Sequence, residues 1–93
     1  MAYLIQLEPV ARRQAKRLPP PVKSAIDEAI KALAVEPRPH GAKRIKRISG
    51  GFRVRVGDYR VIYVVDDRDR AVNVLRIAWR DKAYKRLYEL RGD

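Results

Sequence analysis

The spacing of apolar residues changes from a helical period to a strand period near the middle of this chain of 93 residues. In the first half, apolar side chains recur three and four positions apart at Val22, Ala25, Ile26, Ala29, Ile30 and Leu33. This spacing predicts an amphipathic helix that ends near Glu36. In the second half, Phe52, Val54 and Val56 alternate with arginines, which predicts a strand with one buried face. A chain with both patterns has to pack helices on a sheet, so we expect an α+β fold.

The other segments extend this pattern to the order β-α-α-β-β-β-α. A strand is predicted over residues 3–7, followed by a helix from Pro9 to the run of three prolines that begins at Pro19. Strands over 52–56, 59–65 and 72–79 and a last helix over about 81–90 follow. We expect one domain over residues 1–93, in which an antiparallel β-sheet packs against the N-terminal α-hairpin and leaves its other face open.

The chain carries a large excess of positive charge. Lys and Arg number 22 against 11 acidic residues, and 15 of the 22 are arginine. Such an excess attracts polyanions, and the planar fork of arginine binds phosphate in a bidentate manner, which favours nucleic acid as the partner. High charge combined with few amide side chains is also typical of a heat-adapted protein.

The same composition argues against several classes of protein. The chain has no cysteine, which rules out disulfides and thiolate metal sites. No apolar run approaches the roughly 18 residues that cross a membrane, so we expect a cytoplasmic protein without a membrane partner. The one histidine, His40, lies in a predicted loop, and the sequence contains no phosphate-binding loop or dinucleotide motif. We therefore expect no metal and no cofactor.

The turn at Gly57-Asp58 sets the register of the two strands beside it. It places Arg55 opposite Arg60 and makes one face of the hairpin apolar and the other basic. The apolar face contains Phe52, Val54, Val56, Tyr59, Val61 and Tyr63, and the basic face contains Arg53, Arg55 and Arg60. In the last strand, Leu75, Ile77 and Trp79 share the apolar parity, which assigns Arg76 and Arg80 to the basic face.

Two arginines directly opposite each other on neighbouring strands destabilise a sheet by a few tenths to about 1 kcal/mol. The opposition of Arg55 and Arg60 therefore indicates a face that binds an anion, such as a phosphate that gains negative charge in a transition state. The alternative is a solvated face on which arginines prevent aggregation of the sheet. A basic segment with strand character over residues 44–48 is also expected to contact RNA, through Lys43, Arg44, Lys46 and Arg47.

Two segments resemble the signature of the RelE/ParE toxin superfamily. They are Phe52-Arg-Val-Arg-Val-Gly-Asp-Tyr-Arg-Val-Ile-Tyr63 and Val74-Leu-Arg-Ile-Ala-Trp-Arg-Asp-Lys-Ala-Tyr84. The first segment is specific to the superfamily but not to one activity within it. The resemblance implies a toxin that is encoded beside an acidic, RelB-like antitoxin. For RelE-like members it implies a metal-free endoribonuclease that cleaves mRNA in the ribosomal A site, where the 2′-hydroxyl attacks the adjacent phosphate.

The catalytic positions of that family fall on Arg53, Arg55, Arg60, Arg80 and Tyr84 of this chain. The resemblance implies that Arg60 and Arg80 bind the phosphate and that Tyr84 stacks on a base or transfers a proton. Many relatives have lysine at the first two positions and histidine at the position of Trp79. Arginine keeps its proton, so we expect Arg53 and Arg55 to stabilise charge and to position the RNA. Arg76, on the same face, is expected to add an RNA contact.

Two alternative functions are consistent with the same residues. The first is a ParE-like toxin that inhibits DNA gyrase through protein contact and has no nuclease activity. The second is a basic RNA-binding module without catalysis. Substitution of Arg80 and Tyr84 distinguishes these functions, because a nuclease loses cleavage while it keeps most of its RNA binding.

Overall fold

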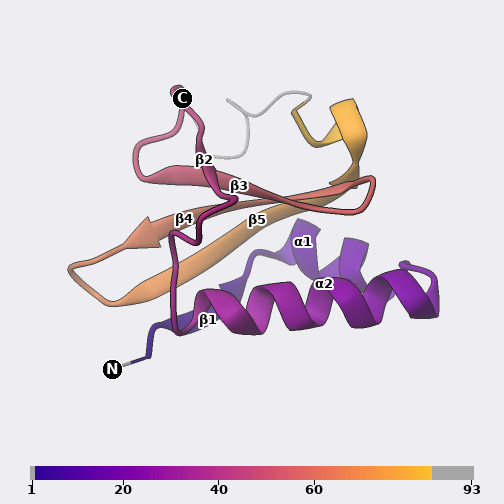
Figure 1. Ribbon diagram of the computed structural model, residues 1–93, viewed down its shortest axis with the longest axis horizontal. Helices are drawn as coiled ribbons and strands as arrows, with labels where there is room; N and C mark the ends of the chain where they lie inside the picture. Colours follow the sequence, from indigo (N-terminus) through magenta and orange to yellow (C-terminus); the bar gives the residue numbers. More distant parts are fainter. Residues whose placement is uncertain (1, 85–93) are drawn as a thin grey trace.

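The structure of the protein, a computed structural model, describes residues 2–84, except for the side chains of Asp81 and Tyr84. Two helices lie along one face of a five-stranded sheet, and a short 3-10 helix lies on the other side (Figure 1). The elements are β1 (Leu4–Leu7), α1 (Pro9–Lys16), α2 (Pro20–Leu33), β2 (Lys43–Arg44), β3 (Gly51–Val56), β4 (Tyr59–Asp66), β5 (Ala71–Trp79) and η1 (Arg80–Tyr84). The α+β class is confirmed, with β2 as a short additional strand in the basic segment.

The sheet has the strand order β1-β5-β4-β3-β2. The pairs β2–β3, β3–β4 and β4–β5 are antiparallel, and the predicted register is confirmed, because Arg55 pairs with Arg60. The edge strand β1 differs from the prediction, since it pairs with β5 in the parallel direction. The α-hairpin carries the chain from β1 to the far edge of the sheet, and the following antiparallel strands return to β1. The last of them, β5, therefore runs parallel to β1.

Proline and glutamine residues define the α-hairpin and its contact with the sheet. Pro9 and Pro20 occupy the first turns of α1 and α2, where a missing N–H costs no helical hydrogen bond. The Gln14 side chain of α1 accepts a hydrogen bond of 2.7 Å from the backbone N–H of Ile77. The pairing of β5 with β1 ends at Val74, so the Gln14 side chain provides a hydrogen-bond partner for a backbone N–H on the edge of β5 that β1 does not reach. No helix within residues 2–84 has the length and apolar character to cross a membrane.

The main core lies between the two helices and the sheet. Its buried members are Ala11, Ala15, Ile26, Ile30, Leu33, Val54, Val61, Tyr63, Val65, Val72, Val74 and Ile77. Phe52, Val56 and Tyr59 pack against this core, so the predicted apolar face of the hairpin does point towards the helices. Tyr63 is fully buried, and its hydroxyl donates a hydrogen bond of 2.8 Å to the carbonyl oxygen of Pro37. This bond anchors the loop after α2 to the middle of the sheet.

A second, smaller core covers part of the face that we expected to be open. Ile62, Val64 and Leu75 of the sheet pack there with Ile48 and Ala83. The assignment of Leu75 to the helix side is therefore wrong. A β-bulge leaves Leu75 without a partner, because Ile62 pairs with Arg76 while the next residue of β4 pairs with Val74. The extra residue shifts the alternation of β5, so Leu75 turns into the second core, where it is 1% exposed.

The last helix begins differently from the prediction. Arg80–Tyr84 form the 3-10 helix η1, and the rest of the predicted helix lies outside the described residues. Arg80 has a φ of +44°, and its backbone N–H donates a hydrogen bond of 2.8 Å to the carbonyl oxygen of Asp58. Ala83 is fully buried in the second core. The chain beyond β5 is thus fixed both to the β3–β4 turn and to the sheet.

The β3–β4 turn depends on the conformation of Gly57, whose φ is +61°. We expect Gly57→Ala to lower the free energy of unfolding by about 1–2 kcal/mol, because a Cβ disfavours this left-handed conformation. Gly41→Ala is the matched control, since a Cβ at either glycine meets no atom within 4 Å and only Gly57 has a positive φ. Urea unfolding followed by circular dichroism compares the two variants. Equal stabilities would contradict this account of the turn.

Candidate nucleic-acid interface

The strand register collects basic side chains in two rows on the face of the sheet away from the helices. The first row runs from Lys43 through Arg53 and Ile62 to Arg76, and the second runs from Arg55 through Arg60 to Ala78. Residues opposite each other on neighbouring strands point to the same face, with Cβ atoms about 5 Å apart. We call the five basic side chains Lys43, Arg53, Arg55, Arg60 and Arg76 the arginine face.

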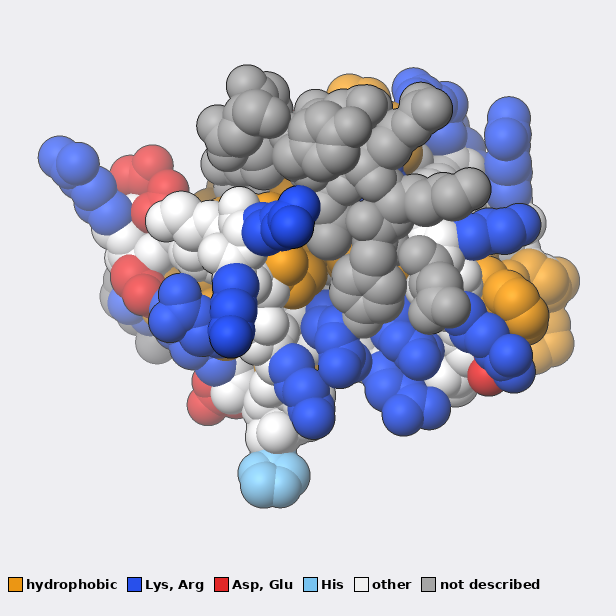
Figure 2. Space-filling model, turned by 90° about the horizontal axis from the view of Figure 1, so that it is seen from above, with side chains coloured by type: hydrophobic (Ala, Val, Ile, Leu, Met, Phe, Trp, Pro, Cys, Tyr) orange, Lys and Arg blue, Asp and Glu red, His pale blue; other side chains and the backbone are white. Residues whose placement is uncertain are grey.

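The salt bridges among the described residues leave three arginines of the arginine face without an acidic partner. Arg53, Arg55 and Arg60 form no salt bridge with any residue that the structure describes. Figure 2 looks onto this side of the molecule, where Lys and Arg side chains gather while the visible acidic side chains lie towards the edges. Because the directly opposed cations of Arg55 and Arg60 repel each other, an anion bound between them relieves an unfavourable interaction.

Arg60 occupies a central place in the second row. Its side chain is partly buried, and its Nη1 donates a hydrogen bond of 3.3 Å to the carbonyl oxygen of Tyr59. Its neighbour on β5 is the small Ala78, and its neighbour on β3 is the exposed Arg55. The other N–H groups of this guanidinium have no partner among the described residues. They offer a phosphate the planar fork that arginine uses for bidentate binding.

Arg80 is the first residue of η1 and lies at the end of the sheet, beyond the two rows rather than within them. Its guanidinium lies over the indole ring of Trp79, 4.5 Å from the ring centroid, and forms a salt bridge of 3.4 Å with Asp58. Both charged side chains are more than half exposed, and an exposed pair of this kind contributes only about 0.2–1 kcal/mol. A phosphate can therefore replace Asp58 as the partner of Arg80 at small cost.

Arg76 makes a contact that the sequence did not reveal. Its Nη1 donates hydrogen bonds to the carbonyl oxygens of Lys82 and Ala83, at 3.4 and 3.2 Å. Both oxygens belong to η1, so Arg76 holds this helix on the sheet. The backbone of Tyr84 ends the same helix. The side chain of Tyr84, a predicted catalytic group, lies outside the described part of the structure.

The basic segment divides between the two sides of the sheet. Lys43 pairs with Arg53 and belongs to the arginine face, whereas Arg44 pairs with Phe52 and therefore points to the helix side. Lys46 and Arg47 are exposed in the loop whose Ile45 and Ile48 pack on the second core. Of the four residues of this segment that were predicted to contact RNA, the structure thus brings Lys43 to the arginine face and exposes Lys46 and Arg47 in the adjoining loop.

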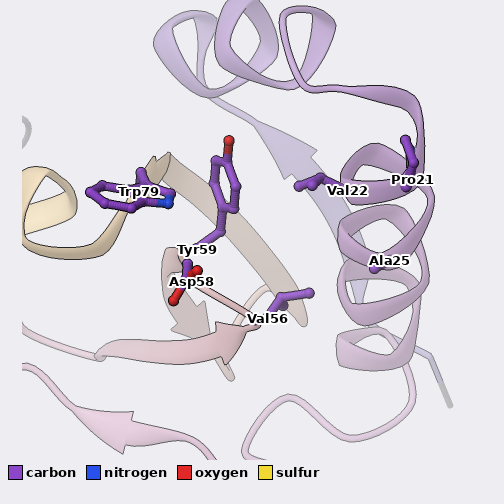
Figure 3. A pocket seen from close by; sticks show the side chains of 8 residues that line it. Pro21, Val22, Ala25, Val56, Asp58, Tyr59 and Trp79 are labelled. Carbon is purple, nitrogen blue, oxygen red and sulfur yellow. The ribbon is translucent and has the colours of Figure 1, made fainter.

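Sequence reasoning missed a groove at the end of the sheet. The groove has a volume of about 430 Å³ and lies between the start of α2 and the β3–β4 hairpin (Figure 3). Tyr59 and Trp79, which pair across β4 and β5, form one wall, and Val22 and Ala25 of α2 form the other. The parity rule assigned Trp79 to the core, yet it is 45% exposed. Its position as the last residue of a strand was the available signal.

A polar network fixes the opposite end of the sheet. The carboxylate of Asp67 accepts a hydrogen bond of 2.6 Å from the Tyr3 hydroxyl and another from the guanidinium of Arg38. These two bonds, with Arg38 as the larger cause, hold the pKa of Asp67 below its usual value. The guanidinium of Arg38 also lies 5.6 Å from the centroid of the Phe52 ring. Arg38 therefore supports the loop after α2 and is not part of the arginine face.

A sheet with an α-hairpin on one face and clustered arginines on the other defines a small α+β protein with a basic surface. Residues 5–84 match the family described as the ParE toxin of the type II toxin–antitoxin system parDE. Two curated toxins named below are also similar to nearly the whole chain. The chain belongs to the RelE/ParE family of toxins of type II toxin–antitoxin systems.

Relatives of known name and solved structures agree with this assignment. The toxin RelG of Mycobacterium tuberculosis is 34% identical over 87 residues, which span 92% of this chain and 100% of the relative. The putative toxin RelE1 of Methanocaldococcus jannaschii is 34% identical over 88 residues, which span 91% of this chain and 98% of the relative. The crystal structure of the toxin–antitoxin complex RelBE2 from Mycobacterium tuberculosis matches 86% of this chain and 100% of that chain, with 33% identity and a TM-score of 0.75. The archaeal RelE–RelB complex from Pyrococcus horikoshii matches 89% of this chain and 100% of that chain, with 26% identity and a TM-score of 0.75.

Proposed function

We propose that this toxin is a ribosome-dependent endoribonuclease that cleaves mRNA in the A site. The observation that carries the proposal is the arginine face, where Arg55 and Arg60 lie directly opposite each other without a salt bridge to any described residue. Permanent positive charges, fixed on a rigid sheet, suit a reaction whose transition state gains negative charge on phosphate. The similarity to toxins named RelG and RelE1 supports a RelE-like activity over simple RNA binding.

In the proposed reaction the 2′-oxygen of the RNA attacks the adjacent phosphorus, and the bond from phosphorus to the 5′-oxygen breaks. The products are a 2′,3′-cyclic phosphate and a free 5′-hydroxyl, so the proton lost by the 2′-hydroxyl is balanced by the proton that the leaving oxygen gains. Arg60 and Arg80 bind the phosphate and stabilise its added charge, while Arg53 and Arg55 position the RNA. Tyr84 stacks on a base or transfers a proton. The proposed reaction uses no metal and no cofactor.

The proposed partners are the ribosome, its mRNA and an acidic, RelB-like antitoxin. Lys43, Lys46 and Arg47 contact the RNA backbone, which makes binding decrease steeply with salt. The antitoxin neutralises the arginine face, and two structurally similar toxins were solved in complexes with RelB proteins. The proposal places the protein in the cytoplasm, where ribosomes work.

Primer extension on an mRNA bound to purified ribosomes tests the proposal. We expect cuts that require the ribosome and carry 2′,3′-cyclic ends. Arg80→Ala should reduce the cleavage rate at least about 100-fold, because the transition state loses one charged partner. Arg13→Ala, which removes the same charge from the exposed side of α1, is the control and should cleave normally. Cuts with 3′-hydroxyl ends, or cuts without ribosomes, would contradict the mechanism.

The description of the matched family names ParE, which supports a second candidate function. In that case the toxin would inhibit DNA gyrase by protein contact, without cleaving RNA. A supercoiling assay with purified gyrase separates the two candidates. Inhibition of supercoiling, together with intact mRNA on the ribosome, would replace the first proposal by the second.

A further inference from the structure

The groove between α2 and the β3–β4 hairpin begins where the arginine face ends. Tyr59 pairs with Trp79 in the row directly after the row of Arg60 and Ala78. Because side chains alternate along a strand, Tyr59 points to the helix side while Arg60 points to the other side. Arg80 marks the boundary between the two surfaces, with its guanidinium over Trp79 and beside Asp58. An RNA strand that crosses the end of the sheet at the β3–β4 turn therefore meets both surfaces in succession.

The chemistry of the groove differs from that of the arginine face. Among the described residues, its lining has no Lys or Arg, and it contains one carboxylate from Asp58, two aromatic rings and the apolar side chains of α2 and Val56. In Figure 3 the rings of Tyr59 and Trp79 stand next to each other, and the Val22 side chain points from α2 towards Tyr59. The Asp58 carboxylate repels a phosphate in such a groove, whereas the flat and largely apolar face of a base is accommodated.

Trp79 has the features of a stacking platform. Trp79 is one of the few large hydrophobic residues that are exposed in the described part of the chain, and 45% of its surface is accessible to solvent. The guanidinium of Arg80 already lies over the ring, 4.5 Å from the centroid, in an arrangement that limits the motion of both side chains. Asp58 adds a hydrogen-bond acceptor to the lining of the groove, and a carboxylate accepts from the exocyclic amino group of a base such as cytosine.

We infer that this groove binds one unpaired base of an RNA whose adjacent phosphates contact Arg80 and Arg60. The inference rests on the proposed function, because it takes RNA as the ligand of the arginine face. Tyr59 and Trp79 provide the stacking surface. Asp58 favours bases that carry an amino group over uracil, which has none.

Fluorescence offers a direct test, because Trp79 is the one tryptophan of the chain. The probe is a trinucleotide with 2′-O-methyl groups, which lacks the attacking hydroxyl and cannot be cleaved. We expect a saturable change in Trp79 fluorescence as the probe is added to the full-length protein. A probe with the same phosphates but without bases should bind about 5- to 150-fold more weakly, which corresponds to the loss of about 1–3 kcal/mol of stacking.

Two substitutions on α2 form a matched pair. Ser24 and Ala25 are both exposed on this helix, but only Ala25 lines the groove. Leucine is a good helix former, so Ser24→Leu and Ala25→Leu should both fold. We expect Ala25→Leu to fill the groove and weaken binding of the probe about tenfold, a loss of about 1.4 kcal/mol. Ser24→Leu should bind like the original protein.

The outcomes separate this inference from the proposed function. Cleavage on ribosomes without a fluorescence change on probe binding would overturn the base-binding groove and leave the nuclease proposal intact. A fluorescence change that Ala25→Leu weakens, without cleavage on ribosomes, would support the groove and overturn the nuclease. If Ala25→Leu leaves RNA binding unchanged but weakens binding of an acidic antitoxin peptide, the groove is a protein-docking site and the inference is wrong.

Discussion

Arg60→Ala is expected to lower the rate of mRNA cleavage on the ribosome about 100- to 1,000-fold, because the phosphate loses a bidentate, permanently charged partner. The same substitution should not destabilise the fold. Arg60 lies directly opposite Arg55, so removing one of two opposed cations should raise the free energy of unfolding by a few tenths to about 1 kcal/mol. A loss of activity with a gain of stability is the signature of a residue retained for function rather than for folding.

Single-turnover cleavage on ribosomes and urea unfolding measure the two effects of Arg60→Ala. Arg68→Ala is the control, because Arg68 is exposed in the turn between β4 and β5 at the other end of the sheet and its loss removes the same charge. Arg60→Lys keeps the charge but not the planar fork, and should recover only part of the activity. Equal cleavage by Arg60→Ala and Arg68→Ala would remove Arg60 from the proposed mechanism.

The sequence predicted those parts of the fold and the site that depend on local periodicity. The alternation around the Gly57-Asp58 turn was sufficient to pair Arg55 with Arg60, because a two-residue turn determines the register of both strands. The amphipathic spacing from Val22 to Leu33 located α2 and its buried residues Ile26, Ile30 and Leu33. Both features follow from side-chain direction within a single element.

The features that the sequence did not predict depend on contacts between distant segments. The bulge at Leu75 has no glycine to mark it, and it reflects the packing of this side chain with Ile62 in the second core. The parallel direction of β1 follows from the path of the whole chain. The contact of Arg80 with Asp58 joins residues 22 positions apart. The groove beside Trp79 exists only once α2 lies against the hairpin.

Tyr63→Phe is expected to lower the free energy of unfolding by about 1–3 kcal/mol near pH 8, because it leaves the buried carbonyl oxygen of Pro37 without a hydrogen-bond donor. Tyr63 is fully buried, and its hydroxyl makes that bond at 2.8 Å. Phenylalanine fills nearly the same volume, so the effect of a cavity is small. Urea unfolding of both proteins gives the difference directly. A variant as stable as the original would mean that the bond does not anchor the loop after α2.

The difference between the two proteins should change with pH. Burial raises the pKa of Tyr63 to about 12 in the folded protein, whereas the unfolded chain releases this proton near its ordinary pKa of about 10. Between these values the unfolded state binds fewer protons than the folded state, so the stabilising contribution of Tyr63 is full below pH 10 and decreases as the pH rises to 12. Two pH units correspond to about 3 kcal/mol, which is at least as large as the expected cost of Tyr63→Phe at pH 8. By about pH 12 the free energy of unfolding of the original protein should therefore no longer exceed that of Tyr63→Phe. Lysines and the other tyrosines titrate in both proteins, so their effects cancel in the comparison. A difference that stays constant from pH 8 to pH 12 would contradict this expectation. It would mean that Tyr63 ionises alike in the folded and unfolded chains despite its burial between the sheet and Pro37.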